Sequence, residues 1–350
     1  MSSALAFVTT TEGMSWLLSC TIKAALLLAA SWFGAALLRR ATAAARHQIW
    51  TLGVVGALLL PLLSWALPSL SLSPETSTIA NTSSFEAPAM FVTGGPATGA
   101  APTWPAWLAI VWAVGALVVA FRLLRGHLAA RRLVHTAEPS VAESWSAALR
   151  EAAASLVLAK RVQVLRSETI GSPMTIGVLR PRVLLPAAAD EWSLERLRAV
   201  LVHELGHVRR HDTVIQLAAQ LGCALYWWNP LAWLAAARLR IEREHACDDL
   251  VLGAGIRPSS YAADLLEVAR SISMDAHARA GAICMADLSW TEARLRRILD
   301  ATAPRRPLRA RFRLAVRGLT LACAVTLACT SSPPVIPPSP TGGTTSLRRI

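Results

Sequence analysis

Long apolar runs constrain this chain more than any other feature of its sequence. Residues 14–38, 49–67 and 107–124 are apolar and almost free of charge, and a weaker run occupies 313–331. Roughly 20 apolar residues are enough to cross a bilayer as a helix. The whole chain is 54% hydrophobic and only 16% charged, whereas soluble domains carry roughly a quarter charged residues. We therefore expect a mainly α, polytopic membrane protein with about four transmembrane helices.

The arginines separate the connecting segments into two sides. The connections at 39–47 and 305–313 are rich in arginine, while 68–106 contains neither lysine nor arginine. We expect a multi-pass protein of the cell (inner, cytoplasmic) membrane. Because basic loops stay in the cytoplasm, both termini should lie on the external side of this membrane. Residues 125–312 should then form a cytoplasmic domain. The segment 68–106 should be a flexible external loop, and 332–350 a disordered external tail.

The net charge of +13 suits an anionic lipid surface. The arginines flank the apolar runs, and no nucleic-acid recognition module is visible, so we expect the lipid bilayer as a partner and no direct nucleic acid.

Residues 213–237 are uncharged over their whole length, yet they should not cross the membrane. Arginines lie at both ends of this segment, which indicates that both ends face the same side of the membrane. The Asn229-Pro230 step interrupts it, because the residue before a proline is disfavoured in a helix. We expect two helices meeting at a turn, either buried in the domain or dipping into the bilayer surface.

A His-Glu-x-x-His pattern, "HELGH" at 203–207, carries the strongest chemical signal. Ser193 can cap a helix that runs through it, which puts His203 and His207 on one face. Two imidazoles one turn apart can bind one zinc ion, while Glu204 reaches a water on the metal. The bare pattern is also compatible with an ordinary solvated helix.

A catalytic zinc needs a third protein ligand, and the acidic segment 238–252 offers several. Glu244 and Asp248 are four residues apart and share a helix face, so that one could bind metal while the other orients a ligand histidine. His245 has Asp249 at the corresponding spacing and stays a rival. The remaining candidate, Glu242, has Ala246 four residues later, which offers no second carboxylate on the same helix face.

Beyond these residues, the order of several motifs resembles the M56 family of membrane metallopeptidases, the group that contains the BlaR and MecR antibiotic-sensing proteins. The motifs are "LLRRATAAARHQIW", "SPMTIGVLRPRVLLP", "HELGHVRRHD", "WWNPLAW", "RLRIEREHACDD" and "SWTEARLRRILD". The resemblance implies a gluzincin-like helical zinc domain on the cytoplasmic face, acting in signal transduction. It implies Zn²⁺ as cofactor, with His203, His207 and Glu244 as metal ligands and Asp248 in a supporting position.

The implied reaction is hydrolysis of a peptide bond with Glu204 as catalytic base, because a zinc ion activates water and polarises a carbonyl. Tyr261 is the preferred candidate for stabilising the oxyanion, although a tyrosine packed in the core is the simpler interpretation. Residues 172–186 predict a small β hairpin, which either pairs with an extended substrate or only packs against the domain.

The chain departs from the BlaR and MecR pattern after its last apolar run. About twenty residues remain there, without the motifs of a penicillin-binding sensor domain, so we expect no β-lactam sensing through that module. The leading hypothesis is a zinc endopeptidase that cleaves a cytoplasmic protein, either a BlaI/MecI-like repressor or the chain itself, with a homodimer left open. The alternatives are a non-proteolytic transducer with a structural metal site and an HtpX/Ste24-like quality-control protease.

Overall fold

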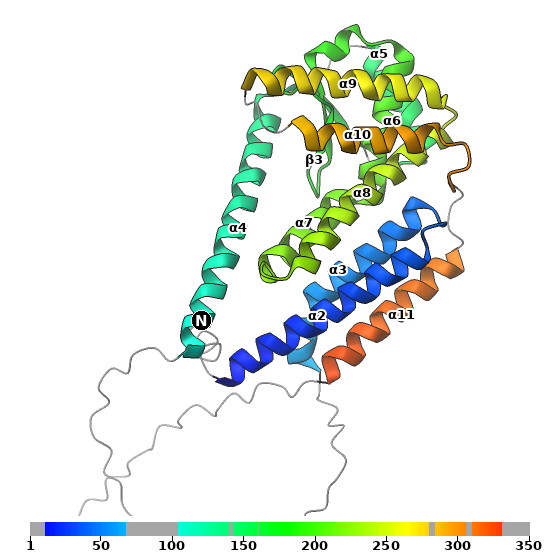
Figure 1. Ribbon diagram of the computed structural model, residues 1–350. Coiled ribbons are helices and arrows are strands. Elements are labelled where there is room, and N and C mark those ends of the chain that lie inside the picture. The colour runs from blue at the N-terminus through cyan, green and yellow to red at the C-terminus, as the bar shows by residue number, and fades with distance from the viewer. Residues whose placement is uncertain are drawn as a thin grey trace, which may run out of the picture.

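Helices make up most of the molecule (Figure 1). The computed structural model describes residues 11–67, 104–139, 143–159, 161–279, 284–305 and 310–330. These residues form ten α-helices and one four-stranded sheet, which confirms the mainly α class. Most of the predicted external loop at 68–106, and the predicted tail at 332–350, lie outside the described residues.

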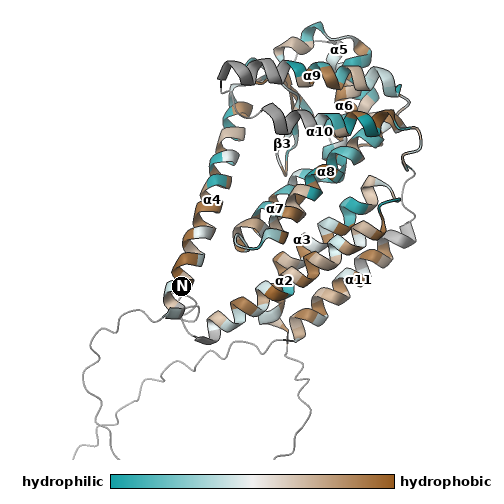
Figure 2. Ribbon diagram, viewed as in Figure 1, coloured by the Kyte–Doolittle hydropathy of each residue, from teal (hydrophilic) through white to brown (hydrophobic). Residues whose placement is uncertain are grey.

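Three helices are long and apolar enough to cross a membrane: α2 (Thr11–Leu37), α3 (Ala43–Ala66) and α4 (Trp104–Thr136). They coincide with the three strongest apolar runs of the sequence, and Figure 2 shows hydrophobic residues along most of their length. A further helix, α11 (Ala310–Cys329), is apolar only from Leu314 onward and is shorter than a typical span. The fourth transmembrane helix therefore stays a prediction.

The helices α2, α3 and α11 lie side by side as a bundle (Figure 1). Close packing of α2 on α3 depends on small residues, since a side chain at Gly53 would collide with Ser31. Lys23, the single charge of the first apolar run, is buried within this bundle. Its ammonium group lies inside the protein rather than at the lipid-facing surface.

The sheet belongs to a second region, at the top of Figure 1. The hairpin of β3 (Met174–Ile176) and β4 (Arg182–Pro186) matches the predicted one, and Gly177 adopts a φ of 102° in its turn. The sheet is larger than predicted, because β2 (Gln163–Ser167) pairs in parallel with β4 and β1 (Glu138–Pro139) pairs with β2. Its order is β1-β2-β4-β3, so that β3 is an edge strand.

Helices surround this sheet and complete the second region. Leucine, valine and alanine side chains from the sheet and the helices form one continuous core. The helices are α5 (Glu143–Ser155), α6 (Leu194–Arg210), α9 (Pro258–Arg279) and α10 (Cys284–Leu299), with a short 3-10 turn at Ala187–Glu191.

A helical hairpin connects the two regions, formed by α7 (Asp212–Leu225) and α8 (Pro230–Gly253). Asn229 caps α8 by accepting a hydrogen bond from Leu231, so the predicted turn at the Asn-Pro step is confirmed. Near the tip of this hairpin, the Tyr226 hydroxyl donates to the carbonyl of Ala57 in α3. The first half of α8 packs in the core of the bundle and its second half in the core around the sheet.

Candidate metal centre

The helix α6 carries the His-Glu-x-x-His pattern and has well-defined ends. Ser193 caps its first turn by accepting a hydrogen bond from the Arg196 amide, as predicted. Its apolar face is buried in the core around the sheet, which fixes the direction of the opposite face. At its C-terminal end, His211 adopts the left-handed conformation with a φ of 59°, and α7 begins at the next residue. This sharp turn brings Asp212 back toward the end of α6.

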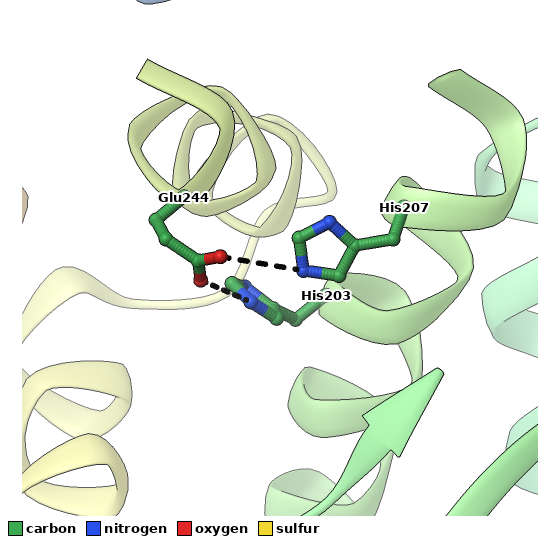
Figure 3. A group of neighbouring side chains, drawn as sticks. All are labelled: His203, His207 and Glu244. Carbon is green, nitrogen blue, oxygen red and sulfur yellow. Dashed lines mark ion pairs between the residues drawn. The ribbon is translucent and has the colours of Figure 1, made fainter. Parts of the chain in front are cut away.

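His203 and His207 from α6 meet Glu244 from α8 (Figure 3). His203 Nε2 lies 3.4 Å from one oxygen of Glu244, and His207 Nε2 lies 4.0 Å from the other. One candidate ligand atom from each residue lies within 4.8 Å of the others. Two imidazole nitrogens and one carboxylate at such spacing are a donor set that zinc accepts, with a further position left for water. The residues therefore fit the implied ion.

A carboxylate network holds the far side of His203. Its Nδ1 atom lies 3.3 Å from the Asp248 carboxylate. Arg294 in α10 binds both oxygens of Asp248, through Nη2 at 2.6 Å and Nε at 3.0 Å. The contact between a carboxylate and the outer nitrogen of the histidine fixes the ring and its tautomer, with Nε2 directed toward Glu244.

His207 has a separate support. Its Nδ1 atom lies 2.9 Å from Asp212 Oδ2, and Arg210 Nε lies 3.3 Å from the same oxygen. Asp212 is almost completely buried. The thiol of Cys247 also contacts Nδ1 of His207, so His207, Asp212 and Cys247 form a second group with metal-ligand geometry. That group would need the ring nitrogen already bonded to Asp212, which favours the first set.

The Tyr261 hydroxyl lies against Asp248 and His203. Its hydroxyl donates to Asp248 at 2.7 Å and lies 3.0 Å from Nδ1 of His203, the nitrogen that faces away from Glu244. The side chain is only 4% exposed. The sequence offered Tyr261 as the preferred oxyanion donor, with a tyrosine packed in the core as the simpler interpretation. The buried side chain and its contacts with Asp248 and His203 agree with the simpler interpretation.

Glu204 lies next to the edge strand of the sheet. The hydroxyl of Thr175 in β3 lies 2.7 Å from Glu204 Oε2 and 3.1 Å from the Glu204 carbonyl oxygen. Thr175 thus orients the carboxylate that the sequence identified as a general base. The sequence quoted this threonine only as part of the hairpin.

The rival acidic residues of α8 have other partners. Glu242 binds Arg46 of α3 at 2.7 Å, and Asp249 forms two hydrogen bonds with Arg297. His245 stacks on the ring of Trp290 at 6.0 Å between centroids. Of the candidates on this helix, Glu244 alone lies between the two histidines, because the rotation of α8 directs its neighbours elsewhere.

The electrostatics of the cluster suit a cation. Burial raises the pKa of Glu244, but its hydrogen bond with His203 and the nearby charges of His207 and Arg294 outweigh burial and hold the pKa well below its usual range. Burial lowers the pKa of His203, whereas Asp248 and Glu244 raise it, with a result of about 9. The carboxylates of Glu244 and Asp248 thus favour a positive charge at His203, and a metal ion bound by this ring would take the place of its proton.

A cavity of about 980 Å³ opens onto these side chains. Its walls come from β3, from α6, α7, α9 and α10, and from the part of α4 around Leu124 and His127. The volume lies at the upper end of the range of ligand pockets. It is large enough for several residues of an extended peptide beside Glu204.

A family model and two curated relatives place the chain near the same group of proteins. A family model described as BlaR1 peptidase M56 matches residues 15–298, more than three quarters of the chain. The regulatory protein BlaR1 of Bacillus licheniformis is 39% identical over 93 residues, which cover 27% of this chain and 16% of that protein. The methicillin resistance mecR1 protein of Staphylococcus aureus is 26% identical over 94 residues, with the same coverage of 27% and 16%. The matched segment is thus a small part of each curated relative.

Proposed function

We propose that this chain, which belongs to the peptidase M56 family, is a membrane-embedded zinc endopeptidase that cleaves a cytoplasmic protein in transmembrane signalling. Family membership implies a metallopeptidase. The observation that carries the finer proposal is that Glu204 lines the same cavity as His203, His207 and Glu244. These three residues match the donor set of a catalytic zinc.

A bound zinc ion would supply Lewis acidity, which activates water and polarises the scissile carbonyl. His203, His207 and Glu244 would hold it. Asp248 and Asp212 accept from the outer nitrogens of the two histidines and keep both rings directed inward. Both rings can then act as ligands without losing orientation.

Glu204 moves the protons. Its carboxylate would accept a proton from the attacking water and deliver it to the leaving amine. Thr175 donates to this carboxylate and fixes its direction. Because Tyr261 is engaged with Asp248, we assign it to the orientation of His203 rather than to the oxyanion.

The substrate would bind as an extended strand against β3. This strand lies at the edge of the sheet, lines the cavity, and contacts Glu204 through Thr175. An exposed edge offers unpaired backbone groups that a peptide can pair with. Candidate substrates are a BlaI/MecI-like repressor and a segment of this chain.

The arginine distribution supports a multi-pass protein with both termini outside and the metal centre in the cytoplasm. The three long apolar helices agree with membrane insertion, and we include α11 as a fourth, short span. Of the other hypotheses, a non-proteolytic transducer with a structural metal leaves the position of Glu204 without a purpose. An HtpX/Ste24-like protease is disfavoured by the family match.

Replacement of the general base tests the proposal. Glu204→Gln in purified full-length protein should retain zinc and lose cleavage of a co-expressed repressor or of the chain itself, by roughly 10²–10⁴-fold. Glu195→Gln makes the same chemical change on an exposed turn of the same helix and should leave both unchanged. Wild-type activity in Glu204→Gln would contradict the proposed function.

A further inference from the structure

The N-terminal end of α3 lies unexpectedly close to the candidate metal centre. His47, in the second turn of this apolar helix, is only 4% exposed. Its Nε2 atom lies 3.8 Å from Asp212 Oδ1. Thr51, one turn further along α3, contacts the opposite nitrogen, Nδ1. The ring is therefore held with Nε2 directed at Asp212.

The two facing atoms have no other hydrogen-bond partner among the described residues. Both His47 Nε2 and Asp212 Oδ1 are buried and unsatisfied. An unsatisfied buried polar group costs roughly 1–3 kcal/mol, so each atom is the natural partner for the other. A small approach of α3 toward Asp212 would close the remaining gap.

Asp212 uses its other oxygen on the metal centre. Oδ2 accepts from Nδ1 of His207 at 2.9 Å. One buried carboxylate thus contacts a residue of the apolar bundle on one oxygen and a predicted zinc ligand on the other. Because a carboxylate is rigid and planar, rotation toward one partner changes its bond to the other.

The same end of α3 is anchored to the helix that carries the third ligand. Arg46, adjacent to His47, binds Glu242 of α8 at 2.7 Å. It also donates to the carbonyls of Arg39 and Ala41 in the connection from α2. His47 is therefore adjacent to a residue that joins α3 to α8 and to the connection from α2. A displacement of the bundle would move the His47 ring relative to Asp212.

We propose that His47 is a positioning residue for His207 and acts through Asp212. The inference rests on the proposed function in one respect, because it takes His207 as a metal ligand. The start of α3, a membrane helix, would then belong to the residues that orient the metal ligands without binding the ion themselves. A displacement of α3 would then change the orientation of His207 and the affinity of the site for its ion.

Two polar substitutions of similar kind test this role in the full-length protein in lipid nanodiscs. In His47→Gln, the side-chain amide can occupy the place of Nε2 and reach Asp212. In His47→Asn, the amide is too short to do so. Zinc affinity is measured by competition with a chelator, and the surroundings of His207 by the visible absorption spectrum of the Co²⁺-substituted protein.

We expect His47→Asn to lower zinc affinity about tenfold, the lower end of the effect of outer-layer mutations, and to shift the Co²⁺ bands. His47→Gln should stay close to wild type in both. Arg46→Gln, which breaks the contact with α8 but not that with Asp212, should lower thermal stability and leave the Co²⁺ spectrum unchanged.

Equal zinc affinity and identical Co²⁺ spectra in His47→Asn and His47→Gln would overturn the inference. If both variants were equally weakened, packing rather than the contact with Asp212 would be responsible, which also overturns it. Failure of the wild type to bind zinc would instead reject the proposed function, so the two failures are distinguishable. The comparison needs no knowledge of the substrate.

Discussion

The two histidines of the candidate metal centre are supported from different parts of the molecule. Around His203, the supporting groups Asp248, Tyr261 and Arg294 come from α8, α9 and α10, which pack around the sheet. Around His207, Asp212 lies at the start of α7 and faces His47 of the apolar bundle. One helix therefore presents two candidate ligands whose orientation depends on two separate cores.

The difference lies in how completely each support is satisfied. Both oxygens of Asp248 bind Arg294, and Oδ1 also accepts from Tyr261. Within the part of the chain that the structure describes, one oxygen of Asp212 has no hydrogen-bond partner. A fully bonded buried network is rigid, whereas a partly satisfied one can respond to a neighbour. Within the proposed ligand set, His203 would therefore be the fixed member and His207 the adjustable one.

The largest effect should come from Glu244, which both sides share. Glu244→Ala should lower zinc affinity roughly a hundredfold or more, since even residues that only orient a ligand change metal affinity about 10- to 100-fold. Cleavage should fall with it. Glu242→Ala, two residues earlier on α8, should retain zinc because its partner is Arg46. Zinc content of the purified proteins checks both. Loss of zinc in Glu242→Ala alone would reverse the ligand assignment.

Asp248→Asn should damage the fixed side in two ways. Arg294 would stay buried with only its 3.5 Å contact with Glu244 as a charge pair. The weakened hydrogen bonds to a charged group cost about 3 kcal/mol of unfolding free energy, and His203 would lose its orienting carboxylate. Chemical denaturation and zinc competition measure the two effects. Asp249→Asn is the matched control. Asp249 lies next to Asp248 on α8, and the substitution breaks its pair with Arg297 of α10. It should lower stability while leaving zinc affinity unchanged.

Asp212→Asn should separate the two effects on the adjustable side. Zinc affinity should fall about 10- to 100-fold, as for other carboxylates that orient a metal-bound histidine. Unfolding free energy should change by only about 1 kcal/mol, because Arg210 can turn to solvent. Equal stability losses in Asp212→Asn and Asp248→Asn would remove the distinction between the two sides.

Tyr261→Phe should have the smallest effect. It removes one hydrogen bond from Asp248, worth about 1 kcal/mol, while Arg294 keeps the carboxylate in place. Cleavage should therefore persist at a rate near that of the wild type. A fall in kcat of about 10²–10³-fold would restore the sequence-based role of Tyr261 as an oxyanion donor.

Local sequence patterns predicted the parts of the molecule that depend on interactions between residues close together in the sequence. The apolar runs identified the three long helices, because their length and composition leave few alternatives. The four-residue spacing of His203 and His207 placed both rings on one face of α6. Ser193 and the Asn229-Pro230 step marked helix boundaries, since capping depends on adjacent residues.

Features that depend on packing between segments far apart in the sequence could not be predicted from local patterns. Glu244 and His245 differ only by the rotation of α8 about its axis, which contacts with two cores determine. Arg294 reaches Asp248 across 46 residues, and no local pattern connects them. Asp212 was visible in the quoted motif, but its role depends on the left-handed conformation of His211. The short strands β1 and β2 depend on long-range pairing in the same way.

The α8 helix passes from one core to the other without a break, and this continuity has a mechanical consequence. Pro230 lies beside the bundle and Glu244 at the candidate metal centre, about 21 Å apart along a rigid rod with a rise of about 1.5 Å per residue. A tilt of about 3° at the bundle end would displace the Glu244 carboxylate by about 1 Å, enough to change catalysis substantially. A change at the bundle end of one continuous helix would thus move Glu244, a proposed metal ligand.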